Sequence, residues 1–194
     1  MPGFWNDVNV EPKRKFRFLM DLGTAGGTLA SYYIKTVKKP TFSMDGAQEV
    51  KYIGHTFKYP GRVKWEDIDI TVLDPASPDA SAILLNIITN SGYNVPKLSP
   101  DVPSAPNVSP IRTISKAASI NALGSLRLSQ IDHLGTPIET WTLHSPFLQK
   151  VDFGDVGYDA DDIVQYTLTV SYDWATLSVP SKHGTVLPGV KSDT

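Results

Sequence analysis

YPGRVKWEDIDITVLDP, residues Tyr59–Pro75, is the most strongly β-prone stretch in the N-terminal half of the chain. It begins at the Pro60-Gly61 turn, and from Ile68 to Val72 apolar and polar residues alternate, as in a strand with one buried face. Between Val63 and Glu66 the alternation has the opposite phase. We therefore expect two strand segments, joined by a β-bulge near Glu66-Asp67 that absorbs the shift.

The polar side of this stretch carries two carboxylates, Asp67 and Asp69, on one face. Paired carboxylates can act as a general acid and base. Alternating polar residues are also what any half-solvated strand shows. The second interpretation is favoured, so the pair predicts a polar row and not an active site.

Length, charge and the absence of cysteine limit the possible functions. A chain of 194 residues fits one domain with a sizeable core. Its formal charge of −2 argues against sequence-independent nucleic-acid binding, and zero cysteines exclude disulfides, zinc-thiolate sites and cysteine nucleophiles. No run approaches the roughly 20 apolar residues of a spanning helix, and we expect a soluble protein without a cleaved signal.

Turn residues and alternation divide the first part of the chain. Residues 1–12 hold few apolar side chains and predict an N-terminal arm. Strands are predicted at Lys15–Asp21 and at Tyr32–Lys39, with the glycines of Gly23–Gly27 as the hairpin tip between them. Thr41–Lys58 is long and polar, and we expect it to project as an extended hairpin.

Two helices are predicted in the middle of the chain. Ser77-Pro78 is typical of an N-cap followed by a first helical residue, and Gly92 is typical of a helix end. A second helix is expected from about Pro110 to Leu123. Residues 95–110 are rich in proline and serine, which predicts a loop or insertion.

The C-terminal part is predicted to be mainly β. Ser125–Leu143 reads as a hairpin, an acidic loop follows, and Ile163–Trp174 alternates as one long strand. The residues after Leu177 lose this periodicity. We expect one domain over residues 1–194, with its core at about 13–177 and a C-terminal tail at 178–194.

Catalytic and metal-binding patterns are weak. The histidines lack ligand spacing, and there is no GxSxG motif. No cofactor is predicted. An acidic loop allows either calcium binding or a solvated turn, through Asp152, Asp155, Asp159, Asp161 and Asp162. Aromatic residues on apolar strand faces allow a sugar-stacking platform, although core packing is favoured: Trp65, Trp141, Tyr166, Tyr172 and Trp174.

Several motifs occur in a characteristic order. They are YPGRVKWEDIDITVLDP, NSGY at Asn90–Tyr93, SKAASINALGSLRLSQID at Ser115–Asp132, and then ETWTLHSPF and VDFGDVGYDADDIVQYTLTVSYDWA. In this order the chain resembles the T4-like tail tube proteins of contractile-tailed bacteriophages. The resemblance covers about Lys15–Ala175, while Val95–Pro110 and the tail after Leu177 depart from it.

The resemblance implies a mainly β fold, an antiparallel barrel or sandwich with one or two flanking helices and extended terminal arms. It implies no enzyme, but a structural subunit whose hexameric rings stack into the inner tube of a contractile tail. Expected partners are further copies of the chain, the sheath protein, the baseplate initiator and the tail terminator. DNA would pass through the lumen without specific binding, and the tube would belong to a virion assembled in the host cytoplasm.

Two sets of residues are hypothesised to serve this assembly. An inter-ring loop would use Lys51, Tyr52, Phe57 and Tyr59. The lumen would be lined by Asp67, Asp69, Thr71, Gln165, Thr167 and Thr169. The alternatives are a baseplate tube initiator, a secretion-system tube protein, or a monomeric carbohydrate-binding β-sandwich.

Overall fold

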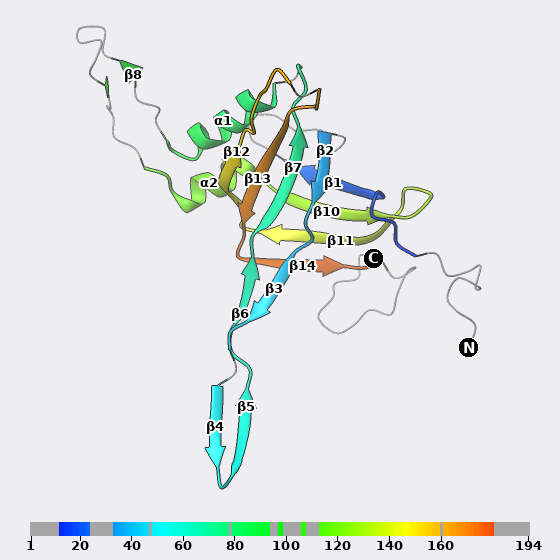
Figure 1. Ribbon diagram of the computed structural model, residues 1–194, viewed down its shortest axis with the longest axis vertical. Coiled ribbons are helices and arrows are strands. Elements are labelled where there is room, and N and C mark those ends of the chain that lie inside the picture. Colours follow the sequence, from blue (N-terminus) through cyan, green and yellow to red (C-terminus); the bar gives the residue numbers. More distant parts are fainter. Residues whose placement is uncertain are drawn as a thin grey trace.

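The computed structural model describes residues 12–23, 33–46, 48–77, 79–93, 97–98, 106–107, 113–159 and 161–180. In this part the chain forms two four-stranded antiparallel sheets, with two helices beside them and a long two-stranded arm leading away from them (Figure 1). The predicted class, antiparallel β with flanking helices, is confirmed.

The first sheet, sheet A, has the strand order β1-β10-β11-β14. Its strands are β1 (Phe18–Leu22), β10 (Leu126–Ile131), β11 (Pro137–His144) and β14 (Trp174–Ser178). Strands β10 and β11 form the predicted hairpin, with Leu128 opposite Trp141. At its turn the Asp132 carboxylate accepts hydrogen bonds from the backbone N–H groups of Leu134 and Thr136, both at 2.8 Å.

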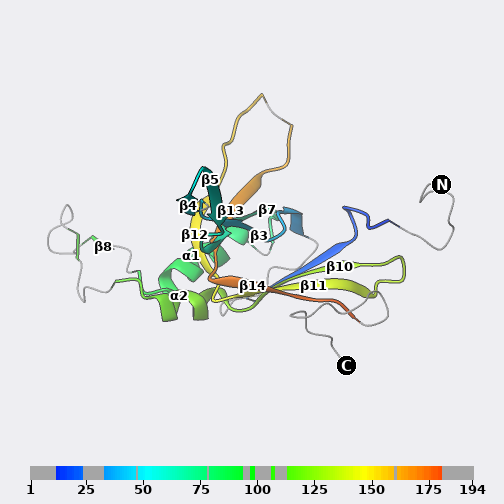
Figure 2. The ribbon, with the colours of Figure 1, turned by 90° about the horizontal axis from the view of Figure 1, so that it is seen from below.

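The second sheet, sheet B, has the order β12-β13-β7-β2. Its strands are β12 (Phe147–Asp152), β13 (Gln165–Ser171), β7 (Ile68–Leu73) and β2 (Ile34–Val37). Ile70 lies opposite Leu168 in the two central strands, and both side chains are fully buried. Figure 2 shows the two sheets lying across each other, and their apolar faces supply one common core.

The stretch Tyr59–Pro75 does contain two strand segments. Strand β6 (Val63–Glu66) pairs with β3 (Thr41–Met44), whereas β7 pairs with β13 and β2. Asp67 lies between β6 and β7. The shift in alternation between Glu66 and Ile68 therefore marks a change of partner strands. The predicted β-bulge is wrong.

Both helices close the core, but they begin later than predicted. Helix α1 (Ala80–Asn90) is capped by Asp79, whose carboxylate accepts from the backbone N–H groups of Ser81 and Ala82 at 2.9 and 3.3 Å, so Ser77 is not the cap. Helix α2 (Lys116–Leu123) ends at Gly124 as predicted, where φ is +78°. Its cap is Ser115, well after Pro110. Helix α1 contributes the buried side chains Leu84 and Ile87 to the core, and α2 contributes Leu123.

The arm consists of two successive hairpin segments. Strands β3 and β6 form its base, and β4 (Gln48–Tyr52) and β5 (His55–Tyr59) form its outer half. Figure 1 shows β4 and β5 lying beyond both sheets at one end of the long axis. At the base Trp65 packs on Phe42 and Tyr172, with ring centroids 5.4 and 6.0 Å apart. The predicted projection of Thr41–Lys58 is confirmed.

Two further predictions are wrong. Strands β1 and β2 lie in different sheets and are not the two arms of one hairpin, and residues 24–27 of the predicted hairpin tip lie outside the described part of the chain. The expected single strand Ile163–Trp174 is divided, because the chain leaves sheet B after Ser171 and enters sheet A at Trp174. Trp174, expected on the buried face, is 47% exposed and stacks on His144.

Some expectations concern residues outside the described part of the chain. These are the N-terminal arm apart from Pro12, nearly all of the C-terminal tail, and most of the proline- and serine-rich segment. In that segment two short strands, β8 (Lys97–Leu98) and β9 (Pro106–Asn107), pair with each other. None of the described helices is long and apolar enough to cross a membrane.

Candidate assembly surfaces

The polar face of sheet B carries the six residues expected to line a lumen. Thr71 lies opposite Thr167, and Asp69 lies opposite Thr169, whose hydroxyl donates to the Asp69 carboxylate at 2.9 Å. Because side chains alternate along a strand, these residues point away from the buried face. The full set lies on this face, with Asp67 directly before β7 and Leu73 opposite Gln165 at the other end: Asp67, Asp69, Thr71, Gln165, Thr167 and Thr169.

Two residues extend this polar face beyond the predicted set. The Ser171 hydroxyl donates to the Asp67 carboxylate at 2.6 Å, and Lys35 donates to the Gln165 side chain at 3.1 Å. Ser171 is in phase with Thr169, so alternation alone could have included it. Lys35 could not have been found in this way, because it lies more than a hundred residues from Gln165 in sequence.

The edges of sheet B are formed by β12 and β2, each with one partner strand among the described residues. Exposed edges offer unpaired backbone groups to another chain, so proteins usually cover them or pair them. Sheet B therefore presents a polar face and two edge strands, β12 and β2.

The outer half of the arm has one apolar face. Val50 lies opposite Phe57, and Gln48 lies opposite Tyr59, on the side that also carries Tyr52. Tyr52, Phe57 and Tyr59 are 67%, 47% and 57% exposed. Lys51 lies opposite Thr56 on the other face. Three of the four predicted inter-ring residues are thus brought together, and Lys51 is not.

The tip of the arm holds an apolar residue in a strained conformation. Ile53 has a φ of +39°, Gly54 has a φ of +73°, and the Ile53 side chain is 85% exposed. Positive φ costs roughly 1–2 kcal/mol for a residue with a Cβ atom, and two-residue hairpin turns prefer Asn-Gly. Sequence reasoning did not assign Ile53 a role, although Ile-Gly between two alternating segments marks the turn.

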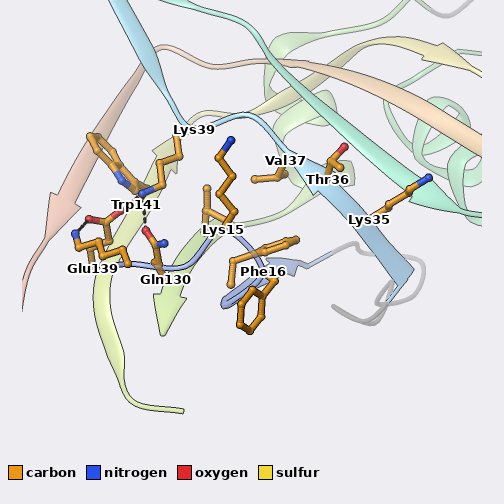
Figure 3. Close-up of a pocket in the computed structure, with 12 residues that line it drawn as sticks. Lys15, Phe16, Lys35, Thr36, Val37, Lys39, Gln130, Glu139 and Trp141 are labelled. Atoms are coloured by element: carbon orange, nitrogen blue, oxygen red, sulfur yellow. Dashed lines mark hydrogen bonds and ion pairs between the residues drawn. The ribbon is translucent and has the colours of Figure 1, made fainter. Parts of the chain in front are cut away.

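A second surface lies between β1, β2 and the β10–β11 hairpin, where a cleft of about 900 Å³ opens. We call it the lysine cleft. Figure 3 shows its aromatic and aliphatic side chains, including Phe16 and Trp141, with lysines around them. The cleft contains four lysines and one glutamate: Lys13, Lys15, Lys35, Lys39 and Glu139. These residues come from three distant parts of the sequence, so sequence reasoning missed the cleft.

Glu139 organises the inner end of the lysine cleft. Its side chain is largely buried and pairs with both Lys13 and Lys39, and Lys39 also donates to Gln130 at 2.7 Å. Burial raises the pKa of the carboxyl, but the hydrogen bonds and charges of the two lysines outweigh burial and hold the pKa below its usual value. Lys15 and Lys35 take no part in the two ion pairs of Glu139.

The described residues contain no group of three or more His, Cys, Asp or Glu side chains placed to hold a metal ion. Among the aromatic residues considered for sugar stacking, Tyr166 makes two polar side-chain contacts. Its hydroxyl donates to Asp74 at 2.5 Å and contacts Ser81, and the Asp74 hydrogen bond raises its pKa. The contact with Ser81 links α1 to sheet B, because Ser81 lies in α1 and Tyr166 in β13. Tyr166 therefore has a structural role.

Comparisons with known proteins support the fold. No protein-family model and no curated protein matches the chain. A chain in the extended-state sheath/tube terminator of an extracellular contractile injection system, PVC, matches with a TM-score of 0.61 and 16% identity, over 87% of this chain and 97% of that one.

Two structures of the anti-feeding prophage, AFP, are also similar. A chain of its tube-terminating cap matches with a TM-score of 0.61 and 16% identity, over 89% of this chain and 95% of that one. A chain of its baseplate matches with a TM-score of 0.55 and 13% identity, over 87% and 96%. At these identities the likeness establishes the fold, and this chain has the fold of chains found in contractile injection assemblies.

Proposed function

We propose that this protein is a structural subunit whose hexameric rings stack into the inner tube of a contractile tail. The observation that carries the proposal is the arm, which presents an exposed apolar face and a strained apolar tip beyond the body of the subunit. A two-stranded hairpin is only marginally stable alone in water, and exposed apolar patches mark interaction sites. The arm therefore suits contact with a second copy in the adjacent ring.

Sheet B supplies the second part of the proposal. Joining its β12 edge to the β2 edge of the next copy would continue the sheet around a ring and leave no edge free. Its polar face would then line the lumen with hydroxyl, amide and carboxylate groups. Such a wall lacks the many unpaired cations that bind phosphates tightly, so DNA could slide past it.

We propose the remaining features by resemblance to T4-like tail tubes. The whole chain, residues 1–194, would act as one domain with terminal arms, and it would work in a virion after assembly in the host cytoplasm. The sheath protein, the baseplate initiator and the tail terminator would be its partners, and the tube would deliver the genome. No catalytic role and no cofactor are proposed.

A second candidate is the tube of an injection device whose cargo is not a genome. The similar structures from PVC and AFP favour this candidate, because they come from injection assemblies. The two candidates share the subunit, ring and tube, and they differ only in what passes through the lumen.

Negative-stain electron microscopy of the purified protein tests the tube itself. We expect rings or long hollow tubes at high protein concentration. Short stubs would indicate that initiator or terminator proteins are needed. A stable monomer that binds glycans would contradict the proposal and favour the carbohydrate-binding sandwich.

A further inference from the structure

The lysine cleft has an excess of positive charge over an apolar floor. Its four lysines and one glutamate give the lining a net charge of +3, and Lys15 and Lys35 lie outside the ion pairs that Glu139 makes. Phe16 is 74% exposed beside it, and Val37 and Trp141 form part of its wall. A segment that combined carboxylates with apolar side chains would complement both the positive charge and the apolar floor of the cleft.

The same chain exposes such a segment between β12 and β13. We call residues 152–163, from the last residue of β12 onward, the acidic loop, of which the structure describes 152–159 and 161–163. It carries five aspartates, and of these Asp152 pairs with Lys150 at 3.3 Å. Phe153 packs on Tyr166, but three other apolar side chains of the loop face solvent: Val156 is 88% exposed, Tyr158 is fully exposed and Ile163 is 66% exposed. Figure 2 shows the described residues of the loop extending away from the sheets. A surface that is both apolar and positively charged would complement exposed apolar groups among carboxylates.

The two surfaces lie at opposite edges of sheet B. The acidic loop follows edge strand β12, whereas Lys35, Thr36 and Val37 of the cleft belong to edge strand β2. Three strand spacings, about 14 Å, separate these edges in one subunit. The loop of one subunit and the cleft of another would therefore meet where the two edges adjoin.

The strand register also places them at the same level of the sheet. One row of paired residues runs from Asp152 through Thr167 and Thr71 to Thr36. Ring closure by rotation brings the β12 edge of one copy beside the β2 edge of the next, and the tilt of the strands to the ring axis sets the register at this junction. With that row continued across the junction, Asp152 of one copy would lie beside Thr36 of the next, and the loop after Asp152 would leave the sheet at the end where Lys35 bonds to Gln165.

We propose that within a ring the acidic loop of each subunit docks in the lysine cleft of its neighbour. Lys15 and Lys35 receive the aspartates, and the apolar floor covers side chains such as Tyr158. The contact is heterologous, with two different surfaces meeting, which is the type that closes into rings. This inference rests on the proposed ring assembly and specifies which surfaces form it.

Charge reversal and its rescue test the contact. Lys15→Glu with Lys35→Glu, or Asp155→Lys with Asp159→Lys, should each abolish ring formation at concentrations where the wild type assembles. Mixing the two variants should restore mixed assemblies, because each reversed surface meets its reversed complement. Arg127→Glu, on the exposed face of β10, is the matched control and should assemble as the wild type does. Size-exclusion chromatography with light scattering gives the readout.

The absence of cysteine permits a second test that does not depend on loss of assembly. A variant with Lys35→Cys and Asp155→Cys, treated with a short bismaleimide, should give a ladder of covalent oligomers ending at the ring size. Arg127→Cys with Asp155→Cys should give no ladder.

The outcomes distinguish failure of the docking contact from failure of the proposed function. Wild-type rings together with intact rings from both charge-reversed variants would overturn the docking and leave the proposed function standing. Loss without rescue on mixing, or no ladder with Lys35→Cys, would also overturn it. A wild type that never forms rings would overturn the proposed function and this inference together.

Discussion

At the scale of single residues, Glu139 is the clearest link between burial and charge. It is buried in sheet A yet ionised, because Lys13 and Lys39 reach it from the segment before β1 and the loop after β2. A buried carboxylate without such partners would favour the neutral form. Glu139 therefore fastens two segments to sheet A where they border the lysine cleft.

Glu139→Gln should lower the free energy of unfolding at neutral pH by about 1–3 kcal/mol, since it removes charge-assisted hydrogen bonds from a buried site. The pKa of Glu139 is lowered from 4.5 in the folded state. Its contribution is therefore complete above 4.5 and is lost as pH falls through the lower folded-state pKa. Urea unfolding at several pH values should show the difference from wild type shrinking on acidification.

Glu49→Gln is the matched control for this measurement. Glu49 pairs with Lys58 at 3.4 Å on the arm, where both side chains are about half exposed or more. Exposed pairs contribute little, so this change should cost at most about 0.5 kcal/mol. Equal losses from the two substitutions would contradict the role given to Glu139.

At the scale of elements, the outer half of the arm lies outside the core, so its role in assembly can be tested without disturbing the folding of the subunit. Strands β4 and β5 place no side chain in the core, and every one of their residues is exposed. Replacing Gly46–Gly61 by Asn-Gly would join Asp45 to Arg62 through a favoured two-residue turn. The shortened subunit should unfold at the wild-type temperature and form single rings that do not stack. Tubes of normal length in electron micrographs would show that the arm is not needed.

Ile53→Asn refines that experiment. The change relieves the positive φ of an isoleucine, so it should leave the hairpin intact or more stable, yet it removes the apolar tip. We expect normal rings and weaker stacking. Leu134→Asn is the control, because Leu134 is also an exposed apolar residue at a hairpin turn, with 78% exposure. Equal stacking by both variants would rule out a specific role for Ile53.

Element prediction from sequence succeeded where the pattern is local. Alternation located β7, the β10–β11 hairpin and the polar face of sheet B, because side-chain period follows directly from strand geometry. It failed at the crossing from β13 to β14. There Tyr172 stays buried while the chain changes sheets, so the alternation continues although the partner strand does not.

Of the assembly surfaces, those that depend on local sequence were predictable, as the elements were. The polar face needed only the period of β7 and β13, and the projecting arm needed only the length and polarity of Thr41–Lys58. The lysine cleft was not predictable, because Lys15, Lys35 and Glu139 are adjacent only after β1, β2 and β11 have come together. Alternation carries no information about which strands become neighbours.

At the scale of the whole molecule, the two faces of the subunit differ in kind. The polar face of sheet B is rich in hydroxyl and carboxylate groups that bond to one another across the strands. Sheet A turns Arg127 and Thr142 outward on the opposite side of the shared core. If sheet B lines the lumen, sheet A faces the outside of the tube, where a sheath would lie.

Cysteine labelling distinguishes these two faces in assembled tubes. Thr167→Cys would place one thiol on the polar face of sheet B, and Thr142→Cys would place one on sheet A, in a chain that has no other thiol. In dissociated subunits a bulky polyethylene-glycol maleimide should label both. In tubes it should still label Thr142→Cys, while Thr167→Cys should be strongly protected because the reagent enters a long lumen only from its ends. A small maleimide should reach both thiols, which shows that protection reflects access and not burial within the subunit. If the bulky reagent labelled Thr167→Cys in tubes as fast as Thr142→Cys, the polar face of sheet B would lie outside, and the lumen would need a different wall.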